Sequence, residues 1–74
     1  MSRLVRMDRS GHTTLAEWAA SDAPSIEAAV VAFREELDRG SFAVVPQGEG
    51  RAEQVTELPV DADLVVMRRP IAGG

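Results

Sequence analysis

The stretch Leu64-Val65-Val66-Met67-Arg68 is the most strongly apolar run of the chain, and it predicts a strand at the centre of a sheet. Pro70 follows two residues later and has no backbone N–H, so we expect strand pairing to end there. Successive side chains in a strand point to opposite faces. If Val65 and Met67 face the core, Val66 and Arg68 therefore face outward.

The N-terminal residues predict a β-hairpin, with strands over 3–8 and 13–18 and a Ser-Gly turn signal between them. The alternation leaves two choices for the buried face. One face would carry Val5, Met7, Thr14, Ala16 and Trp18, and the other Leu4 and Leu15. The sequence therefore predicts the hairpin but does not decide which of its two faces is buried.

A helix is predicted to follow, starting near Ser25, because Pro24 discourages a helical conformation in the residue before it. Gly40 supplies the left-handed residue that commonly ends a helix. Spacings of four, three and four place one apolar stripe on the helix. That stripe, the expected core face, consists of Ile26, Val30, Phe33 and Leu37.

Between the helix and the final strand, residues 41–45 predict a third strand that Pro46 stops, and residues 47–51 predict an exposed turn. Residues 53–58 predict an edge strand closed by Pro59. One helix cannot bury both faces of a sheet. The fold class is therefore predicted to be α+β, a mixed sheet of four or five strands with one helix across one face and with the first and last strands adjacent and parallel.

Composition restricts the function classes. At 74 residues the chain predicts one domain, and 45% hydrophobic with 27% charged residues is typical of a soluble globular protein. A net charge of −4, with eight arginines and no lysine, argues against nucleic-acid binding. The absence of cysteine excludes thiolate chemistry. No run approaches the roughly 20 apolar residues that span a membrane, and no secretory signal is visible, so a cytoplasmic location is expected.

With this element order, the sequence resembles the ubiquitin-like β-grasp superfamily. The segments that carry the resemblance are Ser10-Gly11-His12-Thr13-Thr14-Leu15-Ala16-Glu17-Trp18, Ser21-Asp22, Ser25-Ile26-Glu27, and Leu64-Val65-Val66-Met67-Arg68 leading to Gly73-Gly74. The hairpin is similar to that of ubiquitin. The tail, Arg69-Pro70-Ile71-Ala72-Gly73-Gly74, is similar to that of the molybdopterin synthase small subunit and its sulfur-carrier relatives. The middle of the chain departs from both, because it is shorter and lacks the acceptor lysines of ubiquitin.

The resemblance implies a β-grasp domain over residues 1–69 and a flexible C-terminal diglycine tail over residues 70–74. The Gly74 carboxylate, preceded by Gly73, is then the group that a partner activates. An E1-like adenylating enzyme is implied to do so with ATP and Mg²⁺, while this chain binds no cofactor or metal. The expected docking tail for that enzyme consists of Arg68, Arg69, Pro70, Ile71 and Ala72.

Two routes from the activated Gly74 stay open. Transfer to an amine conjugates the chain to a target protein, with an E2-like protein and a deconjugating metalloprotease as further implied partners. Attack by a sulfur donor instead gives a C-terminal thiocarboxylate, the sulfur-carrier outcome. A third alternative, from another functional class, is a non-covalent β-grasp interaction module that docks by its sheet.

Other polar residues predict no site. His12 has no cysteine or second histidine with which to form a metal site, and Glu35, Glu36 and Asp38 are expected on a solvated face. Gly48-Glu49-Gly50 lacks the strand-to-helix context of a phosphate loop and predicts a turn. No nucleophile, base and oxyanion set can be assembled, so the chain is not expected to be an enzyme.

Overall fold

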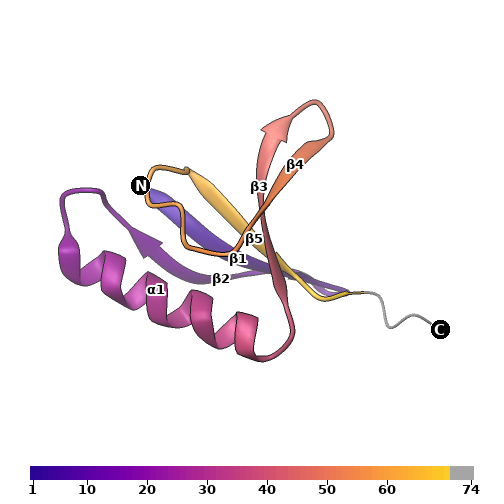
Figure 1. The fold of residues 1–74 in the computed structure, drawn as a ribbon, viewed down its shortest axis with the longest axis horizontal. Coiled ribbons are helices and arrows are strands. Elements are labelled where there is room, and N and C mark those ends of the chain that lie inside the picture. The colour runs from indigo at the N-terminus through magenta and orange to yellow at the C-terminus, as the bar shows by residue number, and fades with distance from the viewer. Residues whose placement is uncertain (71–74) are drawn as a thin grey trace.

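The computed structural model describes residues 1–70 and contains five strands and one helix (Figure 1). In chain order these elements are β1 (Ser2–Asp8), β2 (Gly11–Trp18), α1 (Ala23–Asp38), β3 (Phe42–Gly48), β4 (Arg51–Val55) and β5 (Leu64–Arg68). The fold class is α+β, as predicted.

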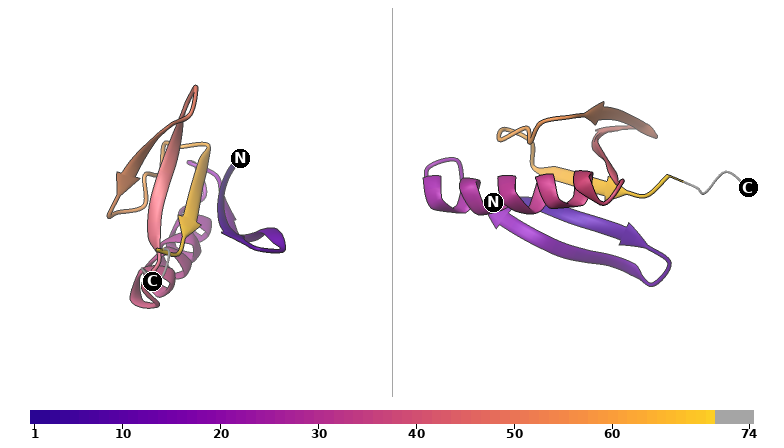
Figure 2. Two further views of the ribbon diagram at one scale, coloured as in Figure 1. Left: turned by 90° about the vertical axis from the view of Figure 1, so that its right-hand side faces the viewer. Right: turned by 60° about the horizontal axis from the view of Figure 1, so that its bottom comes forward.

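All five strands belong to one mixed sheet in the order β2-β1-β5-β3-β4. The first and last strands, β1 and β5, are adjacent and parallel, and β5 also pairs with β3 in the antiparallel sense. Helix α1 lies across one side of the sheet (Figure 2). The predicted architecture is therefore confirmed, and it is compatible with a β-grasp-like fold.

A β-bulge in the N-terminal hairpin decides which of its residues are buried. Leu4 pairs with Ala16, whereas Val5 pairs with Thr14, so Leu15 is an extra residue on β2. The extra residue lets Leu4 and Trp18 both reach the helix side of the sheet, where each is 0% exposed. Leu4 and Leu15 therefore share the core face, as one of the two choices had it, and the bulge adds Ala16 and Trp18 to that face. The other choice, which grouped Ala16 and Trp18 with Val5 and Met7, is wrong because simple alternation assumes an unbroken ladder.

Helix α1 begins two residues before the predicted start, at Ala23. Asp22 is the N-cap residue, and its side chain accepts a hydrogen bond from the Ser25 backbone N–H. Pro24 lies in the first helical turn, where the missing N–H costs nothing because no helical carbonyl precedes it. The helix ends before Gly40, whose φ is +95°.

The buried stripe of α1 differs in part from the predicted one. Ala29, Phe33 and Glu36 are buried, whereas Val30 is half-buried and lines a groove beside Leu58. The helix is therefore rotated slightly toward β2. The apolar pattern did not indicate this rotation, because a small alanine can occupy the closest contact and a charged Glu36 can be buried once it is paired.

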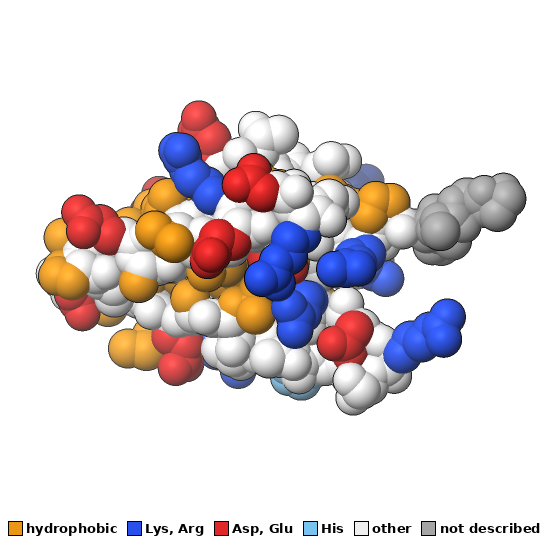
Figure 3. Space-filling model, turned by 90° about the horizontal axis from the view of Figure 1, so that it is seen from below, with side chains coloured by type: hydrophobic (Ala, Val, Ile, Leu, Met, Phe, Trp, Pro, Cys, Tyr) orange, Lys and Arg blue, Asp and Glu red, His pale blue; other side chains and the backbone are white. Residues whose placement is uncertain are grey.

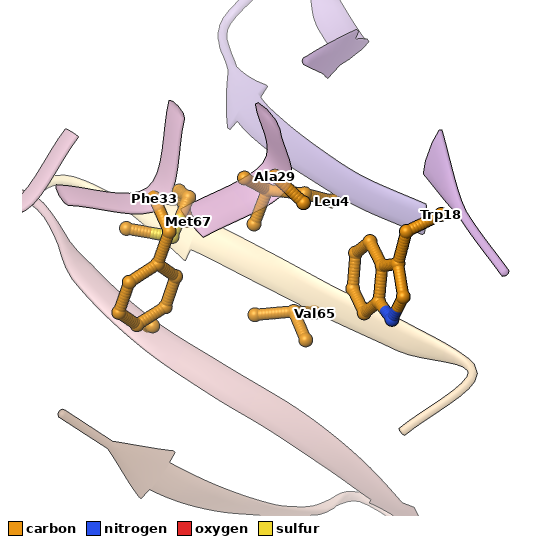
Figure 4. Close-up of a cluster of buried hydrophobic side chains, with 7 residues drawn as sticks. Leu4, Trp18, Ala29, Phe33, Val65 and Met67 are labelled. Atoms are coloured by element: carbon orange, nitrogen blue, oxygen red, sulfur yellow. The ribbon is translucent and has the colours of Figure 1, made fainter. Parts of the chain in front are cut away.

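One core lies between the helix and the sheet (Figure 4). Its buried members are Leu4, Trp18, Ala29, Phe33, Ala43, Val65 and Met67. The Trp18 indole Nε1–H donates a 3.0 Å hydrogen bond to the Val60 carbonyl, which ties β2 to the segment between β4 and β5. Val65 and Met67 are both 0% exposed, so the predicted inward face of the last strand is confirmed.

Strand β3 continues through Pro46 and does not stop there as predicted. Its pairing with β5 ends at Val44, while its pairing with β4 includes Pro46 opposite Ala52. Proline is tolerated because one side of the strand no longer needs a backbone donor. Consequently β4 begins at Arg51, and only Glu49 and Gly50 connect the two strands.

Candidate functional site

The predicted docking tail starts at the end of the central strand. Arg68 is the last residue of β5, and Arg68, Arg69 and Pro70 are all exposed. The other predicted site residues, Ile71, Ala72, Gly73 and Gly74, lie outside the described residues, so their predicted flexibility is not tested. The described part of the site is therefore the end of the molecule at which β5 stops.

Three elements meet at this end, namely the β1–β2 turn, the C-terminus of α1 and the end of β5 (Figures 1 and 2). Parallel pairing of β1 with β5 brings Arg6 opposite Met67, and antiparallel pairing brings Phe42 opposite Arg68. Arg69 shares a shallow hollow with Arg6 and Asp8. Residues that are far apart in sequence thus surround the start of the tail.

Arginine side chains are prominent here. Seen from the helix side, several of them gather at this end of the molecule (Figure 3). We call Arg6, Arg9, Arg39, Arg68 and Arg69 the arginine cluster. Arg6 comes from β1, Arg9 from the β1–β2 turn and Arg39 from the cap of α1. Only Arg68 and Arg69 were singled out from the sequence.

A buried carboxylate orients two members of the arginine cluster. Glu36, 4% exposed, accepts hydrogen bonds at its Oε2 atom from the Nη1 atoms of Arg6 and Arg39, each at 3.4 Å. Its Oε1 atom accepts a 3.3 Å bond from the Ser41 hydroxyl. The expectation that Glu36 is solvated is wrong, because the carboxylate is buried and receives hydrogen bonds from Arg6, Arg39 and Ser41. Glu35 and Asp38 are exposed, as expected.

Asp8 and Ser10 shape the turn between β1 and β2. The Asp8 Oδ1 atom accepts a 2.7 Å bond from the Ser10 hydroxyl and a 2.9 Å bond from the Ser10 backbone N–H. These two bonds stabilise the charged carboxylate, and the hydroxyl bond is the larger cause of a lowered Asp8 pKa. The Asp8 carboxylate is thus held in its charged form by hydrogen bonds within its own turn.

The sheet face opposite α1 carries a second candidate surface. A shallow groove of about 400 Å³ runs over it. Val5 is 4% exposed although no helix covers it, and Val44 and Val66 are half-buried. The side chains that line the groove are Arg3, Val5, Met7, His12, Val44, Pro46, Ala52, Leu64, Val66 and Arg68. We call this surface the open-face groove.

The open-face groove was only partly visible in the sequence. The outward position of Val66 and Arg68 was predicted, and both residues line the groove. The contribution of Val5 was not assigned, because the sequence left the buried face of the hairpin open between two choices. All of the titratable side chains that line the groove are arginine or histidine.

The remaining candidates give no further site. Glu49 and Gly50 form the turn between β3 and β4, as predicted, whereas Gly48 is the last residue of β3. Within residues 1–70, no three His, Cys, Asp or Glu side chains are grouped so that they could hold a metal ion. In the same part of the chain, no helix has the length and apolar character needed to cross a membrane.

Comparison with known proteins found no matching family model, no matching curated protein and no matching solved structure. The functional argument therefore depends on the residues and the geometry described above.

Proposed function

We propose that this protein is a cytoplasmic ubiquitin-like modifier or carrier whose Gly74 carboxylate is adenylated by an E1-like enzyme and conjugated to a target protein. The observation that carries the proposal is the position of β5. This central strand ends in exposed Arg68, Arg69 and Pro70, and the sequence continues from there to Gly73-Gly74. A compact sheet and helix thus precede a short glycine-ended segment.

The chemistry explains why such a segment needs little side-chain bulk. A Gly74 carboxylate oxygen attacks the α-phosphorus of ATP and expels pyrophosphate, giving an acyl-adenylate on the partner enzyme. Glycine fits a narrow passage to the phosphate because it has no Cβ and adopts unusual φ values. Pro70 restricts the backbone before the passage and so reduces the entropy lost on insertion. Arg68 and Arg69 offer charge to carboxylates on the enzyme.

The adenylate then has two possible acceptors. An amine nitrogen that attacks the Gly74 carbonyl carbon displaces AMP and forms an amide, the conjugate. Hydrosulfide from a sulfur donor that attacks the same carbon also displaces AMP and, after loss of a proton, leaves a thiocarboxylate. We propose conjugation first and the sulfur-carrier route as its alternative. In either case the chain is a substrate and not an enzyme, and ATP and Mg²⁺ belong to the partner.

ATP–pyrophosphate exchange with an E1-like adenylating enzyme from the same cell tests the proposal. The full chain should support exchange, and a chain lacking Gly73-Gly74 should not. A Gly73→Ala/Gly74→Ala variant keeps the length and the carboxylate, so its loss of exchange would attribute the requirement to glycine itself. Exchange that survives the deletion would refute the mechanism.

Intact mass of the protein from its native cell distinguishes the two routes. A thiocarboxylate is heavier than the carboxylate by the difference between sulfur and oxygen, whereas conjugation yields a much larger species. The same measurement shows whether Gly74 is the end of the native polypeptide. A native chain that always continues beyond Gly74 would contradict both routes.

The open-face groove favours a second candidate function, a non-covalent interaction module. Buried Val5 with half-buried Val44 and Val66 forms an apolar surface that no element of residues 1–70 covers. This function requires partner binding that survives deletion of residues 71–74 and fails in Val66→Asp. Val31→Asp is the matched control, because Val31 is 58% exposed on α1, away from the groove. Loss of binding on tail deletion would rule the module out.

A further inference from the structure

We propose that the arginine cluster is a docking surface for a carboxylate-rich patch on the activating partner. This inference rests on the proposed function, because it assigns a partner to the end of the molecule from which the tail leaves. It adds Arg6, Arg9 and Arg39 to the two tail arginines. These three side chains come from β1, the β1–β2 turn and the cap of α1.

The distribution of charge supports a specific surface. Five of the eight arginines come from the elements that meet at this end, and the acidic residues of the same parts of these elements are Asp8, Glu35, Glu36 and Asp38. The other three arginines share the rest of a chain that carries twelve acidic residues in all. The molecule is therefore strongly asymmetric in charge, and its field presents the arginine-rich end to an anionic partner.

Two of the acidic neighbours are already engaged. Glu36 is buried and shared between Arg6 and Arg39, while Asp8 accepts two bonds from Ser10. Each of the two guanidiniums uses its Nη1 atom for Glu36, and a guanidinium has five N–H donors in a fixed plane. The Arg39 side chain is 58% exposed, so its other donors face solvent in an orientation that Glu36 has already restricted.

Preorientation by Glu36 favours binding for a physical reason. Long arginine side chains normally lose rotamer freedom when they pair with a ligand. Arg6 and Arg39 have lost part of that freedom in the free protein, so less entropy remains to be lost on docking. The two oxygens of one planar carboxylate can accept two parallel N–H bonds from a guanidinium.

The chemistry of the partner follows from the net charge. A nucleic acid is a long polyanion, and the acidic remainder of this chain repels it over distances comparable to the Debye length of about 8 Å. A local acidic patch on a folded protein touches only the arginine-rich end and avoids that repulsion. The asymmetry therefore favours a protein carboxylate surface over phosphates.

Fluorescence anisotropy with a fluorescein-labelled decaglutamate peptide tests the inference. A double variant, Arg9→Gln/Arg39→Gln, removes two charges of the cluster and leaves both tail arginines. Its matched control is Arg3→Gln/Arg51→Gln, which changes the net charge equally at exposed arginines elsewhere, since Arg3 lies opposite Leu64 at the start of β5. At low salt we expect the cluster variant to bind roughly tenfold more weakly, as two exposed charge pairs imply, and the control to stay within about twofold.

Because Arg39 is the C-cap residue of α1, its replacement can disturb folding, and a second variant tests the inference without that risk. Arg69→Gln lies beyond β5 and outside every helix and strand, so its folding is secure, and we expect roughly threefold weaker binding. Equal losses in the cluster and control variants would overturn the inference, as would salt-insensitive binding or none. Tighter binding of a fluorescein-labelled ten-nucleotide oligothymidylate would instead assign the cluster to nucleic acid.

These outcomes are separate from those of the proposed function. The peptide assay contains no ATP, no adenylating enzyme and no reaction of Gly74. A failed pyrophosphate exchange with a positive peptide result would remove the proposed function and keep an acidic docking surface. Normal exchange with a negative peptide result would keep the proposed function and remove the docking surface.

Discussion

At the scale of single residues, Glu36 joins elements that sequence places far apart. It lies on α1, yet its carboxylate receives bonds from Arg6 on β1 and from Ser41 before β3. A buried charge is tolerated only when such partners satisfy it. Glu36 therefore fixes the end of the helix against the sheet and positions part of the arginine cluster.

Replacement of Glu36 by glutamine tests this role. Glu36→Gln keeps the shape but removes the charge and presents amide N–H groups to donors, so we expect the free energy of unfolding to fall by about 1–3 kcal/mol. Glu35→Gln, the same change at an exposed neighbour, should stay within about 0.5 kcal/mol. Urea denaturation followed by Trp18 fluorescence measures both. Equal effects would contradict the assigned role.

Asp8 predicts a dependence of stability on pH. Its pKa is lower in the folded state, mainly because of the Ser10 hydroxyl. A lowered folded pKa contributes stability that is present above the unfolded pKa, about 3.9, and is lost as pH falls through the folded pKa. Ser10→Ala should therefore raise the Asp8 pKa toward its ordinary value. It should also lower stability at neutral pH by more than it does in acid.

An NMR titration of the Asp8 carboxyl carbon in both proteins measures the first effect, and thermal melts at neutral and acid pH measure the second. Ser2→Ala, at the other end of β1, is a control that leaves the Asp8 turn unchanged. An Asp8 pKa that is identical with and without the Ser10 hydroxyl would disprove the assignment.

At the scale of elements, the turn between β3 and β4 places a non-glycine residue in the left-handed backbone region. Glu49 has a φ of +48° and is followed by Gly50 at +79°, the signs of a type I′ turn between paired Gly48 and Arg51. Glutamate is disfavoured there, since its Cβ crowds the backbone in the left-handed region. Glu49 is the one non-glycine residue with positive φ among the described residues.

Asparagine is a common residue at this turn position, so Glu49→Asn should raise the free energy of unfolding by about 0.5–1 kcal/mol. Glu57→Asn makes the same change of charge at an exposed residue without positive φ and should have an effect within about 0.5 kcal/mol. Chemical denaturation measures the difference. Destabilisation by Glu49→Asn would show that the side chain of Glu49 contributes more than its backbone conformation costs.

At the scale of the whole molecule, one helix covers one face of a five-stranded sheet. The two faces of β5 consequently have different roles. Val65 is 0% exposed beneath α1, whereas Val66 lines the open-face groove. Stability should depend more on Val65 of the covered face than on Val66 of the open one.

Paired truncations on β5 test this division. Val65→Ala leaves a cavity in the core and should lower the free energy of unfolding by about 2 kcal/mol. Val66→Ala removes the same atoms from a half-buried position and should cost about 1 kcal/mol or less. Thermal or urea unfolding of the two variants provides the comparison. Equal costs would show that the open face is as tightly packed as the core.

Sequence patterns predicted much of this fold. The apolar run from Leu64 to Arg68 indicated the central strand, the hairpin and helix signals indicated the other elements, and their order predicted β1 beside β5. These signals are local, because alternation, capping and turn residues act within a few positions of the chain. Arg68, Arg69 and Pro70 were singled out from the resemblance of the tail, and all three are exposed, while their role in docking stays a prediction.

Only the tertiary structure decided which faces are buried and which charges meet. The extra residue Leu15 shifted the alternation of β2, and Glu36 of α1 is buried between Arg6 of β1 and Arg39. Neither feature has a local signature, since each depends on the register and rotation with which distant segments pack. The sequence by itself therefore determined the elements and their order. The three-dimensional contacts determined the open-face groove and the arginine cluster.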